Sequence, residues 1–328
     1  MAAQKPEFSI DQARQIAHEL YGFDGAGKPL PSYYDQNFLL EDPAGSRRVL
    51  KISNTMDDFA AVDLQNGTLQ CAAASRQFEV ARLYPTRDDD PIATVKGRNG
   101  ARHHVRLLSY VAGTPWSASA PYSRRLRLDL GRVTGELTRA LEGFAHPAMQ
   151  RFREWDLKHS LRLERYVRDI GDPRRRRLIE SILERFADHI EPRLEGLPCG
   201  VVHGDVNNDN VLVRGDRVVG LIDFGDVTYT ANVFELAIAV AYAMLGAEDP
   251  SAAADDVLQG YLSVRPLQQR ERDLVFDLAR TRLAASVTFA AHYSRLDPSN
   301  TYVATNTVAG WRVLEMLEGD ETQVEVAS

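Results

Sequence analysis

Apolar and polar residues alternate with a period of two along several segments in the first third of the chain, which is the pattern of half-buried β-strands. Pairs of these segments flank short turns, so the pattern predicts one β-hairpin over residues 38–52 and another over residues 92–110. Ahead of them, Ser9 and Gln12 have the spacing of a capping box and open a helical pattern that ends at Gly22. This part of the chain is therefore predicted to be rich in strands.

A different period governs the rest of the sequence. Between the hairpins, Thr55 and Asp58 resemble a second capping box and predict a helix through about Ala74. After a predicted linker at residues 111–115, apolar positions recur every three or four residues, as on the buried face of a helix. These positions are Leu126, Leu130, Val133, Leu137, Leu141 and Phe144, and further on Phe234, Ala237, Ile238 and Ala241.

The change of period predicts an α+β fold of two lobes within 328 residues. A small β-rich N-lobe is expected at residues 1–110 and a larger, mainly helical C-lobe at residues 111–328. The composition, 44% hydrophobic and 26% charged, is that of a globular protein. The run Arg174–Arg177 opens a helical pattern and is interpreted as a solvated helix end.

Charge and cysteine content exclude several classes of function. A net charge of −7 provides no electrostatic footprint for nucleic acid or for an anionic membrane. Cys71 and Cys199 are too few for a disulfide framework or a thiolate metal site. We find neither a charged-then-apolar leader nor an apolar run of about 18 residues. A cytoplasmic enzyme without a membrane or nucleic-acid partner is therefore expected.

A loop rich in Asp and Asn joins two short apolar strands in the C-terminal part. Asp205 and Asn210 lie five positions apart in this loop, and the strand that returns from it ends on Asp223. Phosphoryl transfer needs this set, because one carboxylate orients a hydroxyl while an Asn and a second carboxylate hold magnesium. The order H-x-D-x-x-x-x-N followed by D-F-G is a kinase signature, and both halves occur here.

Two other interpretations of this loop are weaker. A calcium-binding loop would need Gly and Glu where Asn210 and Asp216 stand, and helices where the flanking residues are β-branched. A turn without function is also compatible with Asn and Asp, which bond their own backbone. It would leave Asp223 at the end of the paired strand unexplained.

Lys51 lies mid-strand among apolar neighbours, about 150 residues before the loop, where kinases place the lysine that binds the α and β phosphates. Strand alternation puts Val49 on the same face, where it would cover the nucleotide base. No G-x-G-x-x-G stands between the first strands. A polar loop with Ser32, Gln36 and Asn37 occupies that place and would present polar groups to phosphate instead.

The chain resembles the aminoglycoside phosphotransferase and choline kinase superfamily, which shares the protein kinase fold. Within it, the chain is most similar to hydroxylysine kinase and its bacterial relatives, some of which are fused to aminotransferase domains. The resemblance covers nearly the whole chain and is carried by residues 30–38, 49–53, 153–157, 203–210, 220–226 and 235–239.

This resemblance implies a role for each matching residue. Asp205 would orient the acceptor hydroxyl and take up its proton, while Asn210 and Asp223 would bind Mg²⁺. Lys51 would bind the phosphates of GTP or ATP. The helix glutamate that pairs with this lysine in the family corresponds to Gln65, which predicts a neutral hydrogen bond in place of an ion pair.

The resemblance also places the nucleotide base at a hinge between the lobes. Ser109, Tyr110 and Val111 stand where the family bonds the base through its backbone. His203, just before the loop, is expected to bond the loop backbone.

The acceptor site is less defined by the sequence. Asp226 would bind an amine of the acceptor, or else cap a helix or brace the metal loop. Arg153 and Asp156 would hold an amino-acid zwitterion, with Trp155 beside them, or else form helix packing and a surface ion pair. Glu235 is expected to anchor the loop rather than to contact substrate.

The sequence thus predicts a kinase that phosphorylates a small hydroxylated amine or amino acid, with hydroxylysine as the leading acceptor. One alternative is an aminoglycoside-type antibiotic kinase. The other is a catalytically inactive nucleotide-binding regulator, which the missing glycine loop and Gln65 favour and the intact kinase motifs oppose. A fusion to, or association with, an aminotransferase is a further expectation of the resemblance.

Overall fold

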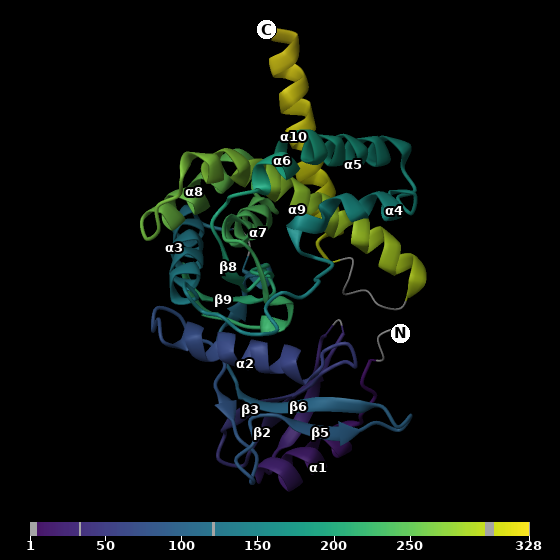
Figure 1. Ribbon diagram of the computed structural model, residues 1–328, viewed down its shortest axis with the longest axis vertical. Helices are drawn as coiled ribbons and strands as arrows, with labels where there is room; N and C mark the ends of the chain where they lie inside the picture. The colour runs from purple at the N-terminus through teal and green to yellow at the C-terminus, as the bar shows by residue number, and fades with distance from the viewer. Residues whose placement is uncertain (1–4, 33, 120–121, 299–304, 328) are drawn as a thin grey trace. The chain divides into compact units, whose positions relative to one another are not determined.

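The computed structural model describes residues 5–32, 34–119, 122–298 and 305–327, the last eight of these by their backbone alone. The chain divides into two compact units (Figure 1). The first comprises residues 1–112 with 145–149, and the second comprises residues 113–144 with 150–328.

An antiparallel sheet forms the centre of the first unit. Its strands follow the order β1 (Ala26–Leu30), β2 (Gln36–Glu41), β3 (Arg47–Ile52), β6 (Arg102–Ser109) and β4 (Leu83–Tyr84), and β5 (Ala93–Lys96) also pairs with β6. Pairing of β2 with β3 and of β5 with β6 confirms both predicted hairpins.

Helix α1 (Ile10–Tyr21) covers one face of this sheet (Figure 1). The predicted capping box is present, and Gly22 ends the helix in the left-handed region with φ 65°. The core between helix and sheet is apolar and consists of Phe8, Ala13, Ala17, Phe38, Leu40, Leu50, Ile52, Val105 and Leu107.

Helix α2 (Phe59–Ala73) lies over the opposite face of the sheet (Figure 1). Its position follows from Arg106, which alternates with the core residues of β6 and donates to the side chains of Gln65 and Asn66. The prediction that Thr55 opens this helix is wrong. The carboxylate of Asp58 caps it instead, accepting from the Ala61 N–H, because the residues before Asp58 form a turn.

Helices dominate the second unit. They include α3 (Arg124–Ala140), α5 (Pro173–Arg185), α7 (Val233–Met244), α8 (Pro250–Leu262), α9 (Gln269–Leu296) and α10 (Thr307–Ala327), with the short α4 (Glu164–Val167) and α6 (Glu191–Leu194). Helix α7 packs against α3, α8 and α9, and all of its residues are buried (Figure 1). The predicted buried faces are confirmed, except that Phe144 lies beyond the end of α3 and is only half-buried.

Short strand pairs frame the predicted catalytic loop. Strand β8 (Cys199–Val202) pairs with β11 (Thr228–Ala231), and β9 (Val211–Arg214) pairs with β10 (Arg217–Leu221). Strand β7 (Thr114–Pro115) joins β9 on its other side. The predicted linker at residues 111–115 is therefore wrong at its end, because its last two residues are part of this small sheet.

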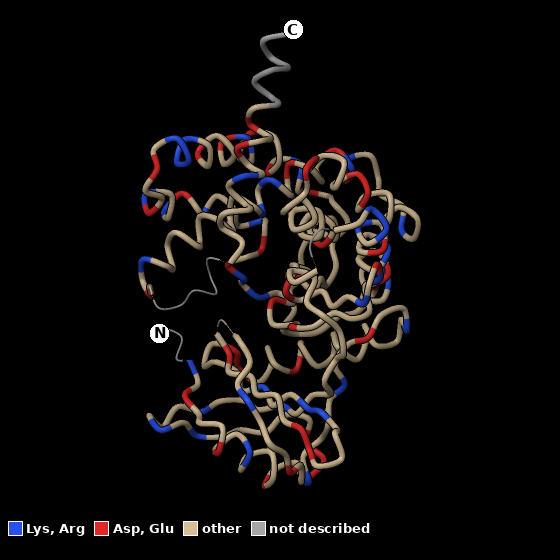
Figure 2. The backbone as a smooth tube through the Cα atoms, turned by 180° about the vertical axis from the view of Figure 1, so that it is seen from behind, with Lys and Arg blue, Asp and Glu red and all other residues tan. Residues whose placement is uncertain are grey.

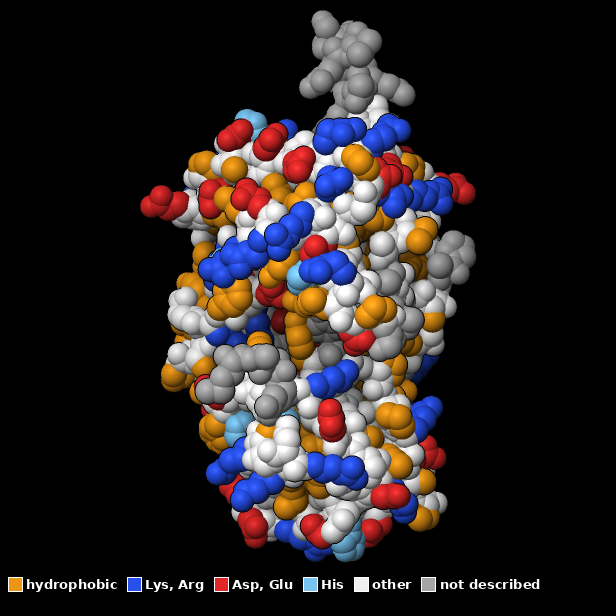
Figure 3. Space-filling model, turned by 90° about the vertical axis from the view of Figure 1, so that its right-hand side faces the viewer, with side chains coloured by type: hydrophobic (Ala, Val, Ile, Leu, Met, Phe, Trp, Pro, Cys, Tyr) orange, Lys and Arg blue, Asp and Glu red, His pale blue; other side chains and the backbone are white. Residues whose placement is uncertain are grey.

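Charged residues are distributed along the backbone of both units rather than gathered in one segment (Figure 2). On the face shown in Figure 3, basic and acidic side chains are interspersed with hydrophobic ones. The arginine run at the start of α5 forms a helix end as predicted, capped by Asp172, and Arg175 pairs with Glu315 at 2.8 Å. Among the described residues, no helix combines the length and apolar character needed to cross a membrane.

Candidate active site

The loop between β8 and β9 is held by side chains behind it. The His203 N–H donates to Glu235 Oε2 at 2.5 Å, and the His203 ring lies 4.4 Å from the ring of Phe224. His203 Nε2 is 3.0 Å from the Ile222 carbonyl oxygen, while Nδ1 accepts from the Asp205 N–H. Both contacts are satisfied by the tautomer with the proton on Nε2. The expectation that His203 bonds the loop backbone is confirmed.

Two further residues make this loop conformation possible. Glu235 is 1% exposed on α7, and its burial raises the pKa of its carboxyl group. Its contact with the His203 backbone agrees with the anchoring role that the sequence favoured. Gly204 has φ +79°, and a Cβ there would lie 2.8 Å from the Asp226 carbonyl oxygen, so only glycine fits.

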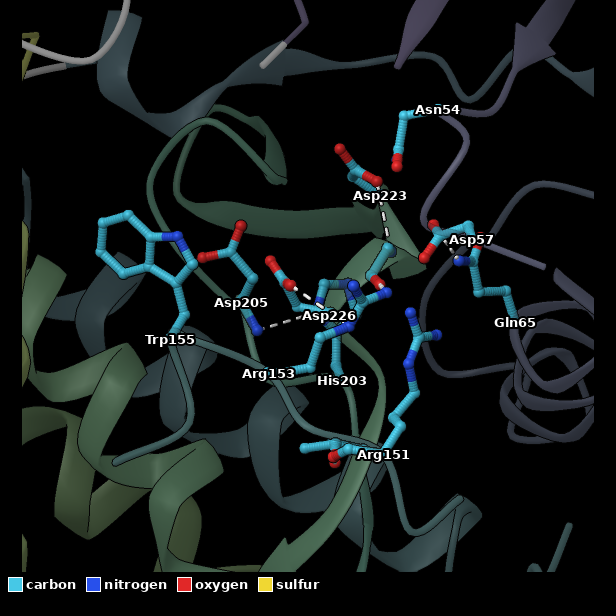
Figure 4. A network of polar contacts seen from close by, with 12 residues as sticks. Asn54, Asp57, Gln65, Arg151, Arg153, Trp155, His203, Asp205, Asp223 and Asp226 are labelled. Carbon is cyan, nitrogen blue, oxygen red and sulfur yellow. Dashed lines mark hydrogen bonds and ion pairs between the residues drawn. The ribbon is translucent and has the colours of Figure 1, made fainter. Parts of the chain in front are cut away.

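Asp205 accepts three hydrogen bonds from side chains of the second unit. Arg282 Nη2 donates to Oδ1 at 2.7 Å, and the amides of Asn207 and Asn210 donate to Oδ2 at 2.9 and 2.8 Å. Figure 4 shows the carboxylate beside the indole of Trp155. Burial raises the pKa of Asp205 to about 7, and the charge of Arg282 opposes that rise.

Asn210 and Asp223, the predicted metal ligands, both carry oxygen donors of the kind that a hard cation prefers. The amide nitrogen of Asn210 is turned to Asp205, and Asn207 Oδ1 accepts from the backbone N–H of Asn210. Asp223 has φ 59°, in the left-handed region that non-glycine residues adopt uncommonly. Within the described residues, no group of three His, Cys, Asp or Glu side chains has the arrangement of a metal site. A magnesium ion here would therefore depend on these two residues together with phosphate and water.

Arg153 and Asp226 contact each other around the segment after Asp223 (Figure 4). Arg153 Nη2 donates to the Gly225 carbonyl oxygen, and Nε lies 3.7 Å from Asp226 Oδ1. Both residues line a cavity with Trp155. Arg153 thus braces the segment after Asp223 and also lines the cavity.

Asp156 is placed differently from Arg153. It caps the short helix at Leu157–Leu163, accepts from Thr230 Oγ1 at 3.0 Å, and pairs with Lys158 at 3.0 Å. Its side chain is fully buried. These contacts agree with the structural alternative of the sequence analysis, and Asp156 also lines the cavity that Arg153 and Trp155 share.

In the first unit, Lys51 on β3 forms a buried ion pair. Its Nζ lies 3.1 Å from Asp35 Oδ2, and Asp35 Oδ1 accepts from both the backbone and the side chain of Asn54. The predicted replacement of this ion pair by a neutral bond to Gln65 is wrong. The Gln65 amide instead donates to Asp57 at 3.1 Å and accepts from Arg106 at 2.6 Å. The carboxylate for Lys51 comes from the loop before β2.

Strand register sets a polar row across the sheet face that carries Lys51. Asn37, Lys51 and Arg106 are direct neighbours on β2, β3 and β6. Val49 lies two positions from Lys51 on the same face. Asn37 Oδ1 is buried without a hydrogen-bond partner among the described residues, which is unusual for a side-chain oxygen.

The other two residues of the predicted phosphate loop differ from Asn37. Gln36 uses both ends of its amide on the backbone of Phe8, at 2.8 Å each, and so ties down the N-terminal segment. Ser32 is half-buried in the loop before β2, where its carbonyl oxygen accepts from Lys5. Tyr33, in the same predicted stretch, lies outside the described residues.

The predicted hinge residues lie at the end of β6 and just after it. The Ser109 N–H donates to the Arg82 carbonyl oxygen, and the Tyr110 N–H donates to that of Arg47. The Val111 N–H makes no backbone hydrogen bond within the described part of the chain. Because the other two N–H groups are already hydrogen-bonded, the Val111 N–H is the one of the three that could donate to a ligand.

Three residues that contact Asp205 or Lys51 were not identified from the sequence. Asn207 stands inside the loop motif, so its neighbourhood was a usable signal. Asp35 lies just before the first predicted hairpin, and its contact with Lys51 depends on how the loop folds back. Arg282 lies 77 positions from Asp205 in a long helical pattern, and nothing local distinguishes it.

Comparisons with known proteins agree with this geometry. The model of the phosphotransferase enzyme family matches residues 26–282. Hydroxylysine kinase of Mus musculus is 32% identical, over 96% of this chain and 91% of that protein.

Two solved structures share the fold at low sequence identity. A microcompartment-associated aminopropanol kinase has a TM-score of 0.75 at 18% identity, covering 95% of this chain and 98% of its own. An amicoumacin kinase in complex with AMP-PNP, Ca²⁺ and its antibiotic has a TM-score of 0.71 at 16% identity, covering 94% of each chain. The predicted α+β, protein kinase-like fold is confirmed.

Proposed function

The chain belongs to the phosphotransferase enzyme family and is a small-molecule kinase with a hydroxyl acceptor; we propose that it transfers the γ-phosphoryl group of GTP or ATP to hydroxylysine. The full-length similarity to a hydroxylysine kinase carries the choice of acceptor. The proposal of phosphoryl transfer rests on the three side-chain donors around Asp205. They hold its carboxylate in one orientation, and phosphoryl transfer requires a carboxylate held in this way.

Asp205 orients the acceptor hydroxyl in this proposal and takes up its proton. Transfer of a γ-phosphoryl group has a loose transition state, so the protein mainly positions groups and neutralises charge. A pKa near 7 suits a residue that must accept a proton at neutral pH and release it afterwards.

Asn210 and Asp223 are the residues that would hold Mg²⁺. The donor set fits this ion, because Mg²⁺ binds through one or two carboxylates, amide oxygens, phosphates and water. With the Asn210 amide nitrogen turned to Asp205, its Oδ1 remains for the metal. When bound, the ion neutralises charge on the phosphates.

The nucleotide would be bound by residues of the first unit. Lys51 would supply the cation for the phosphates, and Asn37 stands next to it in register with a buried oxygen that has no hydrogen-bond partner among the described residues. Val49 would cover the base, and the Ser109–Val111 segment would bond it through the Val111 N–H and a neighbouring carbonyl. Ser32 adds a hydroxyl to the loop, whereas Gln36 has its structural contact with Phe8.

For the acceptor, Asp226 and Arg153 are the proposed contacts. They line a small cavity of about 10 Å³ beside Trp155, at whose edge they would offer a carboxylate for an ammonium and a guanidinium for a carboxylate. Asp156 is not included, because its carboxylate is committed to Lys158 and Thr230.

The test is magnesium-dependent consumption of GTP and of ATP with 5-hydroxylysine, homoserine, choline, ethanolamine and an aminoglycoside, each with the Asp205→Asn protein as blank. We expect the highest kcat/KM with hydroxylysine. Preference for the aminoglycoside would instead support an antibiotic kinase. Nucleotide binding without turnover of any acceptor would contradict the proposal and support a regulator.

A further inference from the structure

A buried arginine on α9 contacts the carboxylate at the centre of the candidate site. Arg282 is 1% exposed, donates to Asp205 Oδ1 at 2.7 Å, and donates through Nη1 to the Trp155 carbonyl oxygen at 3.2 Å. Its guanidinium lies over the rings of Trp155 and Tyr242, with Cζ at 4.6 and 5.7 Å from the centroids. One side chain therefore links the catalytic loop, the segment after Arg153 and helix α7.

The energetic cost of this arrangement argues for a role beyond stability. Removing a guanidinium from water is costly, and the mutual attraction of a buried pair often does no more than offset that cost. A well-packed apolar side chain at this position of α9 would serve the core as well. Arg282 thus orients its hydrogen-bond partners rather than adding to the stability of the core.

The contacts of Arg282 leave Asp205 little rotational freedom. Oδ1 is bound by Arg282, and Oδ2 is bound by the amides of Asn207 and Asn210 on the opposite side. The two bonded nitrogens of Arg282 diverge, one to Asp205 and one to Trp155, so the planar guanidinium cannot turn without losing a bond. A lysine would supply the positive charge, but it lacks the planar group with two diverging N–H donors.

We propose that Arg282 is a positioning residue for phosphoryl transfer: it fixes the orientation of the Asp205 carboxylate and thereby aligns the acceptor hydroxyl. This inference rests on the proposed function, since it takes Asp205 to be the group that orients the hydroxyl. Arg282 itself does not contact the reacting atoms.

The experiment compares Arg282→Gln, Arg282→Lys and the control Arg280→Gln. Arg280 is 4% exposed on the same helix, and two positions correspond to a turn of about 200°, so its side chain leaves α9 in another direction. We expect kcat to fall about 100-fold in Arg282→Gln, with the nucleotide KM unchanged, because small misplacement of a catalytic group costs about that much. Arg282→Lys should recover part of kcat, and Arg280→Gln should lower the melting temperature but keep kcat.

A kcat of folded Arg282→Gln within about threefold of wild type would overturn the inference, as would an equal loss in Arg280→Gln. If wild type phosphorylates none of the acceptors, the proposed function fails separately. Crystal structures of wild type and Arg282→Gln then test the positioning directly. We expect the Asp205 carboxylate to rotate away from Asn207 and Asn210 in the variant, and an unchanged carboxylate would refute the role.

Discussion

Each unit of the molecule contains a buried ion pair that involves one residue of the kinase motifs. In the first unit, the motif residue is the cation, Lys51, and its partner Asp35 comes from the neighbouring loop. In the second unit, the motif residue is the anion, Asp205, and its partner Arg282 comes from a helix 77 positions away. Both motif residues are thus held by a charge that the motif does not contain.

The two pairs differ in what surrounds them. Lys51 and Asp35 are both buried, with side chains 8% and 9% exposed, and Asp35 is also bonded to Asn54. The side chain of Arg282 is 2% exposed, whereas the side chain of Asp205 is 19% exposed. The first pair is closed to water, while the second leaves its carboxylate open on one side. In the proposed function, Lys51 would therefore have to shift relative to Asp35 to bind phosphate, whereas Asp205 would keep its contact with Arg282.

The largest effect is expected from Asp205→Asn. Turnover should fall by a factor between about 10² and 10⁴, because the amide neither takes up the proton nor carries the charge. The fold should remain, since the Asn Oδ1 still accepts from Arg282, but the melting temperature should fall because the buried guanidinium loses its counter-charge. Steady-state kcat with a matched thermal melt checks both statements. Near-normal turnover would show that the open carboxylate is not the one that acts.

Lys51→Met removes the cation of the buried Lys51–Asp35 ion pair. We expect kcat/KM for the nucleotide to fall about 100-fold, and the free energy of unfolding to fall by roughly 3–5 kcal/mol, because Asp35 is left buried and unpaired. The double variant Lys51→Met/Asp35→Asn should recover most of the stability but none of the activity. Urea unfolding of the three proteins measures this, and equal stability of the single and double variants would show that the two residues are not coupled.

How much of this the sequence predicts depends on how local each contact is. The β9–β10 hairpin, the Asp205–Asn210 spacing and the Ser9 capping box arise within a few residues, so periodicity and residue type were sufficient. The position of Lys51 was predictable from its strand, but its partner was not, because Asp35 reaches it only when the loop folds back over β3. Gln65 was assigned as partner by position in a helix, yet Arg106, on the neighbouring strand, takes its amide oxygen. Arg282 was out of reach, since only tertiary packing of α9 brings it to Asp205.

Asp35→Asn removes the negative charge of the pair while keeping Lys51. We expect the nucleotide KM to rise about tenfold with a smaller change in kcat, because Lys51 loses its charged partner but Asn54 keeps an acceptor. Asp58→Asn is the control in the same unit: it caps α2, and asparagine caps equally well. Isothermal titration with a non-hydrolysable nucleotide measures the affinity. An unchanged affinity would mean that Lys51 needs no partner from this loop.

Glu235 extends the comparison to a carboxylate that is held by a backbone N–H rather than by a cation. Its pKa is raised by burial, so the folded protein binds this proton more tightly than the unfolded chain does. The contribution of Glu235 to stability is therefore lost progressively as pH rises from about 4.3, the ordinary value, through the raised pKa of the folded state. Glu235→Gln removes this titration but keeps an acceptor for the His203 N–H, so its unfolding free energy should gain on that of wild type as the pH rises above the ordinary pKa of glutamate. Parallel pH dependences of the two proteins would mean that Glu235 ionises as easily in the folded protein as in water, and that its contact with the loop compensates for its burial.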